Sequence, residues 1–264
     1  MRLEVDSRVA SGGRTRCVNF LYHELRAAKT DYSYAMETSE FARHLDYFCE
    51  LRRDEKTLVL PEITFDDGHL SNFEIALPEL TRRGLTARFF ITAGWTGAKA
   101  GYMNWEQLRE LAAAGQQVGA HGWSHTLLTH CNAQELVTEL QTARVTLEDK
   151  LGMAIDTMSL PGGRYNATVL EGCKAAGYAQ VFTSIPRFEL VPLGAMVGRL
   201  NLLSGMSLEW IAQILDPESG KLQRLERQYR IKDAAKRALG DRLYHTIWSW
   251  VNHGEKPEAE GGLA

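Results

Sequence analysis

The sequence predicts an α/β fold with a parallel sheet. Short apolar runs typical of buried strands alternate with longer segments in which apolar residues recur at helical spacing. The 264 residues are enough for one barrel-sized domain with a substantial core, and we find no internal repeat. In such a fold, functional residues are expected where strands end, at the carboxyl edge of the sheet.

The strands are predicted from apolar runs that end at polar or turn residues. The first run ends at His23, and a later one ends at two adjacent carboxylates. Pro61 is expected to interrupt the second strand, because proline has no backbone N–H to donate. The expected strands are 17–22, 58–65, 89–92, 117–120, a strand ending at Leu160 and a strand near Val181.

The helices are predicted from apolar residues spaced three and four apart and from their end signals. Asn132 with Glu135 three residues later has the pattern of a capping box at a helix start. Gly84, Gly115 and Gly152 mark helix ends. The expected helices start near Ser39, cover 73–80, follow Trp105 to Gly115, run from Asn132 to Gly152, and span about 167–176.

The character of the chain changes at both ends. Residues 1–16 are polar and glycine-bearing and are expected to be a flexible lead-in to the domain at 17–215. Residues 216–264 are expected to be a helical extension with a disordered tail from Glu255. Lys221–Val251 is charged and carries Trp248 and Trp250, which predicts helices that either cover the barrel or mediate homo-oligomer formation.

The composition is that of an ordinary soluble protein. Hydrophobic residues make up 44% and charged residues 24%, and the net charge of −3, with no basic segment, gives no reason to expect nucleic acid as a partner. The four cysteines are scattered without metal-site spacing, so reduced thiols are expected. The N-terminus lacks the apolar core of a signal peptide, and no window approaches the ~18 apolar residues of a membrane span. These features predict a cytoplasmic location.

Two short motifs carry the chemistry. Asp66 and Asp67 follow an apolar run and precede Gly68, and His121 and His125 lie four residues apart. Two imidazoles and one carboxylate suit zinc or a similar divalent ion with a position left open for water. The second carboxylate is then free to act as a base, which indicates metal-assisted hydrolysis.

The residues around these motifs resemble a known family. Thr64–Gly68 and Gly119–Leu128 are similar to the first two motifs of the polysaccharide deacetylases, carbohydrate esterase family four, and the resemblance spans roughly residues 17 to 215. It implies a distorted, incomplete (β/α) barrel and a deacetylase catalytic domain. It also implies Asp67, His121 and His125 as metal ligands, Asp66 as general base, and water activated by the metal as the nucleophile. The implied metal is Zn²⁺, with Co²⁺, Ni²⁺ or Mn²⁺ as alternatives.

The resemblance also bears on the proton donor to the leaving group. Most family members carry this histidine in a Leu-x-His strand end late in the domain, but 197–202 contains no histidine here. Asn19–Glu24 has that form instead, as in the circularly ordered deacetylases that act on poly-N-acetylglucosamine. We therefore expect His23 to be the general acid; the alternative is a structural histidine at a strand end.

The third family motif, Arg-x-Pro-aromatic-Gly, is altered at Ser159–Arg164. Pro161 and the final glycine match, but Ser159 replaces the arginine that would orient the base. Gly162 replaces the aromatic residue, and its N–H could donate to the developing oxyanion. Arg164 either supplies the missing charge or is only a loop arginine. Trp123 and Trp95 could stack on a sugar ring, or they pack in the core.

The leading hypothesis is a metal-dependent hydrolase that removes an N-acetyl or other acyl group from an amino sugar, an oligosaccharide or a glycan precursor. A second hypothesis is an amidohydrolase that acts on a non-carbohydrate amide or cyclic imide. It stays open because the altered third motif weakens the inference that the substrate is a sugar. A third is a catalytically weak or silent relative that only binds glycans.

Overall fold

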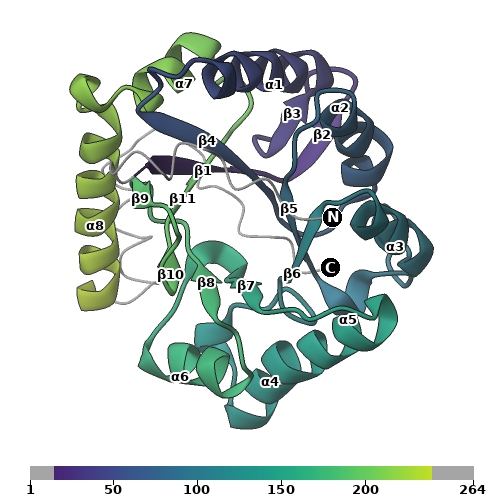
Figure 1. The fold of residues 1–264 in the computed structure, drawn as a ribbon. Helices are drawn as coiled ribbons and strands as arrows, with labels where there is room; N and C mark the ends of the chain where they lie inside the picture. The colour runs from purple at the N-terminus through teal and green to yellow at the C-terminus, as the bar shows by residue number, and fades with distance from the viewer. Residues whose placement is uncertain (1–14, 240–264) are drawn as a thin grey trace.

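The computed structural model describes residues 15–239, in which helices surround a strongly curved sheet (Figure 1). The sheet has nine strands in the order β10-β8-β7-β6-β5-β4-β1-β11, and β9 pairs with β1 outside this path. Neighbours along the path pair in parallel, and β9 is antiparallel. The strands are β1 (Arg16–Tyr22), β4 (Val59–Phe65), β5 (Arg88–Ile91), β6 (Gln117–Ala120), β7 (Thr157–Ser159), β8 (Gln180–Phe182), β9 (Glu189–Leu190), β10 (Met196–Val197) and β11 (Arg199–Asn201).

The sheet closes almost completely through one short segment of chain. β10 pairs with β8, and one residue later β11 pairs with β1, so residues 196–201 connect the two ends of the sheet. Gly198 lies at this crossing, and a Cβ there would come within 2.4 Å of the Ile185 carbonyl oxygen. The predicted incomplete (β/α) barrel is confirmed.

Helices lie outside the barrel and connect successive strands, as parallel pairing requires (Figure 1). Helix α1 shows why the spacing was informative, because Phe41, Leu45 and Phe48 are all buried. Phe48 stacks on Phe20 of β1, with ring centroids 5.3 Å apart. The helices are α1 (Thr38–Arg53), α2 (Leu77–Thr81), α3 (Trp105–Ala113), α4 (Ala133–Val137), α5 (Ala143–Leu151), α6 (Ala167–Ala175), α7 (Leu208–Leu215) and α8 (Lys221–Leu239).

The local end signals behave as predicted at most positions. Asn132 accepts hydrogen bonds from the backbone of Gln134 and Glu135, and the Glu135 side chain accepts one from the backbone of Asn132, which confirms the capping box. Gly152 ends α5 in the left-handed conformation. The four cysteines are free thiols, as expected.

Some features of the fold differ from the sequence prediction or were not foreseen. The expected interruption at Pro61 is wrong: β4 runs through it, because this half of the strand pairs only with β1, and β5 joins at Thr64 and Phe65. The helix from Asn132 to Gly152 contains a π-helical turn at Thr138–Thr142 between α4 and α5. A small parallel pair, β2 (Glu24–Arg26) and β3 (Ala35–Glu37), was not predicted.

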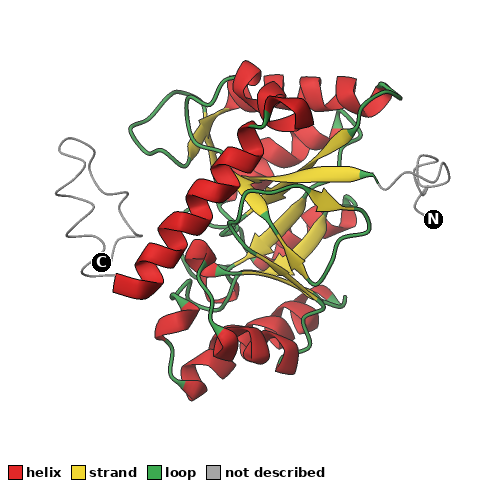
Figure 2. Ribbon diagram, turned by 90° about the vertical axis from the view of Figure 1, so that its left-hand side faces the viewer, coloured by secondary structure: helices red, strands yellow, loops and turns green. Residues whose placement is uncertain are grey.

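The C-terminal extension contains α8, which lies along the side of the barrel next to α7 (Figures 1 and 2). Leu222 is buried and Leu225 packs against the core, so the start of α8 covers the barrel as one alternative predicted. Homo-oligomer formation stays a prediction. The predicted lead-in up to residue 14, Trp248, Trp250 and the tail lie outside the described residues. Within residues 15–239, no helix is long and apolar enough to cross a membrane.

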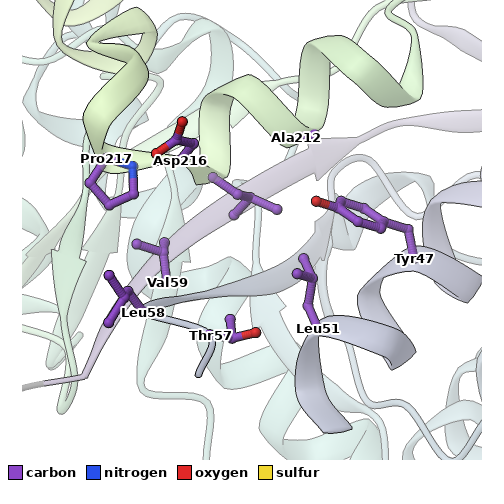
Figure 3. Close-up of a pocket in the computed structure, with 9 residues that line it drawn as sticks. Tyr47, Leu51, Thr57, Leu58, Val59, Ala212, Asp216 and Pro217 are labelled. Carbon is purple, nitrogen blue, oxygen red and sulfur yellow. The ribbon is translucent and has the colours of Figure 1, made fainter. Parts of the chain in front are cut away.

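A mostly apolar pocket lies between α1, the start of β4 and α7 (Figure 3). Tyr47, Leu51 and Val59 are among its lining residues. It lies at the amino end of β4, whereas Asp66 and Asp67 follow the carboxyl end of the same strand. This pocket is therefore separate from the candidate site.

Candidate active site

The candidate site is assembled from residues that follow parallel strands. His23 follows β1, Asp66 and Asp67 follow β4, His121 follows β6, and Ser159 is the last residue of β7. Because these strands are parallel, their carboxyl ends meet at one end of the barrel. The fold thus brings together residues that are far apart in the sequence.

The Asp66–Gly68 turn is held by backbone hydrogen bonds to neighbouring strand ends. The Asp66 N–H donates to the Tyr22 carbonyl at 3.1 Å, and the Thr92 N–H donates to the Asp67 carbonyl at 3.4 Å. Asp67 has φ of 75°, a left-handed conformation that is costly for a residue with a side chain. His125, with φ of 64°, is the other non-glycine residue with positive φ in the described part of the chain. Two of the three predicted ligands therefore have strained backbones, which is typical of functional sites.

Asp67, His121 and His125 form a compact donor cluster. Oδ1 of Asp67 is 3.3 Å from Nε2 of His121 and 3.3 Å from Nε2 of His125. One ligand atom from each residue lies within 4.8 Å of the other two, and of the groups within residues 15–239 this is the one that could hold a metal ion. Ligands about 2.1 Å from a tetrahedral ion are separated by about 3.4 Å, so the spacing suits such an ion. Oδ1 of Asp67 is also buried without a hydrogen-bond partner among the described residues, as expected of a ligand atom.

His121 is oriented by the end of the next strand. Its Nδ1 lies 2.9 Å from the Ser159 carbonyl oxygen, which can only accept, so Nδ1 must carry the proton in that hydrogen bond. The neutral ring then presents the lone pair of Nε2 toward Asp67. A metal-ligating histidine is commonly fixed in this way by a carbonyl on its other nitrogen.

His125 is supported by an aromatic side chain. Its ring stacks on Trp95, with centroids 5.3 Å apart and an interplanar angle of 30°. The Lys99 ammonium nitrogen lies 3.5 Å from the centroid of the same indole. Trp95 therefore contacts both His125 and Lys99, and its ring centroid also lies 4.6 Å from that of Tyr102.

Asp66 is held by an arginine that sequence analysis did not single out. Arg199 of β11 donates from Nη1 to Oδ1 at 2.7 Å and from Nη2 to Oδ2 at 2.8 Å. The Ser159 hydroxyl donates to Oδ2 at 2.9 Å and accepts from Nη2 of Arg199 at 2.6 Å. Arg199, only 1% exposed, thus places beside Asp66 the positive charge that the altered third motif lacks and for which Arg164 is one predicted source. The signal in the sequence is a lone arginine within the apolar run 197–202.

The two aspartates and the histidines beside them have shifted pKa values. Burial alone would raise the pKa of Asp66, but the Arg199 guanidinium together with His121 and His23 outweighs burial and holds that pKa below the ordinary value. Burial likewise opposes ionisation of Asp67, yet the neighbouring imidazoles lower its pKa. For His121, the two carboxylates outweigh burial and raise its pKa, whereas burial and His121 lower the pKa of His125. Both carboxylates are therefore ionised at neutral pH.

His23 lies within the electrostatic reach of this cluster. Burial lowers its pKa, and the charges of Asp67 and Asp66 oppose that effect. Its Nδ1 is buried without a hydrogen-bond partner among the described residues, and its ring packs edge-on against Tyr34 at 4.9 Å. The Asn72 side chain donates to the His23 carbonyl at 2.7 Å, which anchors the backbone and leaves the ring nitrogen unpaired.

The altered third motif packs beside the histidine loop. A Cβ on Gly122 would be 3.6 Å from Cγ of Pro161, and a Cβ on Gly162 would be 2.6 Å from Leu127. Gly162 also has φ of 61°, so glycine is required there for both conformation and space.

Trp123 is half-buried against the core and against Gly94, which agrees with the alternative prediction that it packs in the core. Substrate-binding roles for Pro161, Gly162, Arg164 and Trp123 stay predictions.

Comparisons with known proteins find similarity to carbohydrate deacetylases. The sequence model of the polysaccharide deacetylase family matches residues 52–181. Among curated relatives, the Bacillus subtilis (strain 168) protein YxkH, a polysaccharide deacetylase by name, is 25% identical over 181 residues. The peptidoglycan-N-acetylglucosamine deacetylase PgdA of Listeria monocytogenes is 33% identical over 110 residues, 41% of this chain. The match covers 63% of the length of the Bacillus protein and 22% of the Listeria protein.

Solved structures show the same fold. The structure of IcaB from Ammonifex degensii is 26% identical, with a TM-score of 0.60, over 77% of this chain and 97% of that one. The Streptococcus pyogenes deacetylase PplD, solved in complex with acetate, has a TM-score of 0.69 at 19% identity over 78% of this chain and 100% of that one.

Proposed function

This chain belongs to the polysaccharide deacetylase family, and from that premise we propose that it is a metal-dependent hydrolase that removes an N-acetyl or other acyl group from an amino sugar or glycan precursor. One observation carries the proposal: a carboxylate and two imidazoles converge on one point, and a second carboxylate is held separately beside them. The relatives named for a substrate act on N-acetylglucosamine in peptidoglycan or on chitin. Both substrates carry acetamido groups on pyranose rings.

Asp67, His121 and His125 would hold the divalent ion, with Zn²⁺ the first candidate and Co²⁺, Ni²⁺ or Mn²⁺ the alternatives. The donor set fits, because Oδ1 of Asp67 is buried and unpaired and Nε2 of His121 is oriented through Nδ1. When bound, such an ion supplies Lewis-acid chemistry, which polarises an amide carbonyl and makes water nucleophilic near neutral pH.

Asp66 would act as the general base. Its Oδ2 is 3.8 Å from Nε2 of His121, so the carboxylate borders the metal position without being part of the three-ligand cluster. Arg199 and Ser159 fix the carboxylate plane and keep it ionised and able to accept a proton from the attacking water. The two aspartates are thereby divided between proton transfer and metal binding.

His23 would donate a proton to the leaving amine. Its unpaired Nδ1 and its place after β1 put a titratable group on the same end of the barrel as the two aspartates. Breaking the C–N bond of an amide requires protonation of the nitrogen, and histidine is the usual donor. A buried Nδ1 without a partner among the described residues supports the proton-donor role over a purely structural role at the strand end.

Acetate release tests this proposal directly. The purified protein is incubated with Zn²⁺ and with N-acetylglucosamine oligomers, chitin fragments and peptidoglycan fragments, and free acetate is measured. We expect release by the wild type and a loss of about 10²- to 10⁴-fold in Asp66→Asn, as for removal of a general base. The matched control is Asp149→Asn, the same change at an exposed position of α5. Absence of acetate from every substrate, or full activity in Asp66→Asn, would contradict the proposal.

A further inference from the structure

The loop that joins His121 to His125 is not held by regular secondary structure. It follows β6, and its backbone has positive φ at Gly122 (78°) and at His125 (64°). A non-glycine residue in this region costs on the order of 1–3 kcal/mol and persists only when the surroundings hold it in place. Some group outside the loop must therefore stabilise the spacing of the two histidines.

The buried carboxylate of Glu139 accepts hydrogen bonds from this loop. Its Oε2 accepts hydrogen bonds from the backbone N–H of Trp123 at 2.8 Å and of Ser124 at 3.1 Å. Its Oε1 accepts from the Ser124 N–H at 3.2 Å and from the Ser124 hydroxyl. The residue is only 5% exposed, so these charge-assisted bonds form where water competes little.

Glu139 packs closely against the loop. A Cβ at Gly122 would come within 2.7 Å of Oε2 of Glu139, so only glycine allows the carboxylate to approach. Glu139 itself lies in the π-helical turn Thr138–Thr142, and π-helical turns are often found at functional sites.

We propose that Glu139 is a positioning residue that sets the separation and orientation of the two histidine ligands through the backbone of Trp123 and Ser124. This inference rests on the proposed function, because it concerns the metal site assigned above. The carboxylate does not belong to the donor cluster of Asp67, His121 and His125. It acts on metal affinity by fixing the loop before the ion arrives, so that binding does not have to order it.

Metal affinity measured without any substrate tests the inference. We compare wild type, Glu139→Gln and Ser124→Ala by Zn²⁺ competition against a chromogenic chelator, and we record the visible absorption spectrum of the Co²⁺-loaded proteins. Glu139→Gln keeps the shape of the side chain but places an NH₂ group against N–H donors. Ser124→Ala removes the hydroxyl, with its hydrogen bonds to Glu139 and Thr126, and leaves both backbone bonds to Glu139. Glu171→Gln, on the exposed face of α6, is the matched control.

We expect Glu139→Gln to bind Zn²⁺ about 10- to 100-fold more weakly, with an altered Co²⁺ spectrum. Ser124→Ala should bind Zn²⁺ measurably more weakly than the wild type but by less than tenfold, and Glu171→Gln should match the wild type. Wild-type affinity and an unchanged Co²⁺ spectrum in Ser124→Ala and in any folded Glu139→Gln would overturn the inference while leaving the proposed function intact. If Glu139→Gln does not fold, Ser124→Ala decides alone. A wild type that binds no divalent ion would overturn the proposed function, and this inference with it.

Discussion

The ion pair between Arg199 and Asp66 gives the sharpest prediction for stability. Both side chains are almost fully buried, and the guanidinium makes two parallel bonds to the carboxylate. The Arg199→Met substitution keeps an apolar side chain next to Phe90 and Phe182 but leaves the Asp66 charge buried without its counter-ion. Removal of one member of a buried pair costs about 3–5 kcal/mol. At about 2–4 °C per kcal/mol for a chain of this size class, Tm should fall by roughly 6 to 20 °C.

A double-mutant cycle separates this pairing from general loss of packing. Asp66→Asn alone leaves the guanidinium unpaired, whereas Asp66→Asn combined with Arg199→Met removes both charges. The double variant should therefore lose less stability than the sum of the two single variants, by about 1–3 kcal/mol in urea unfolding. Additivity within about 0.5 kcal/mol, or a loss below 1 kcal/mol in Arg199→Met, would refute the reasoning.

The same substitution should change the pH dependence in a defined direction. In the wild type the pKa of Asp66 is depressed, so its ionised form contributes stability above the unfolded pKa of about 3.9. That contribution is lost as the pH falls through the lower folded pKa. In Arg199→Met, burial is no longer opposed by the guanidinium, and the pKa rises. The acid limb of the kcat/KM profile should therefore move to higher pH than in the wild type.

Three other outcomes follow from the same structure. His23→Gln should lower kcat by about 10²- to 10⁴-fold while Zn²⁺ affinity, measured by chelator competition, stays within a few-fold; a large loss of zinc would instead make His23 part of the metal site. Removing the metal with a chelator should abolish acetate release, and restoring Zn²⁺ to about 100 times its Kd should stabilise the fold by about 2.7 kcal/mol in thermal unfolding, an increment that disappears if no ion binds. Gly119→Ala should destabilise the barrel by about 1–3 kcal/mol, because its Cβ would lie 2.6 Å from both Phe90 and Thr157. The control Gly194→Ala has open space and should be nearly neutral, so equal losses in the two variants would contradict the packing argument.

Local patterns were sufficient to predict the main elements of the fold. Apolar runs and helical spacing gave the strands β1, β4, β5 and β6 and the helices between them, because parallel strands buried on both faces are continuously apolar. The two-residue strands β9 and β10 depend on pairing with other strands and are too short to have a local signal of their own. The continuation of β4 through Pro61 could not be predicted from the sequence either. It depends on the lack of a second neighbouring strand at that point, which only the tertiary structure reveals.

The site could be predicted as far as its motifs extend. Asp66, Asp67, His121 and His125 were found because adjacent carboxylates at a strand end and paired histidines are recognisable in a short window. Arg199 is 133 residues from Asp66 in the sequence and reaches it only because the barrel closes at β11. The position of Glu139 depends on a π-helical turn, whereas the sequence periodicity there predicts an ordinary α-helix. Long-range partners of this kind need the fold before they can be identified.

The location of a bound divalent ion is the most direct test of the central claim. A crystal of the protein grown with Zn²⁺ and measured at the zinc absorption edge should show one strong anomalous peak. We predict it about 2.0–2.2 Å from Oδ1 of Asp67 and from Nε2 of both His121 and His125, with Asp66 outside the coordination shell. A peak elsewhere, or no peak in excess zinc while the three side chains keep the arrangement described above, would contradict the account.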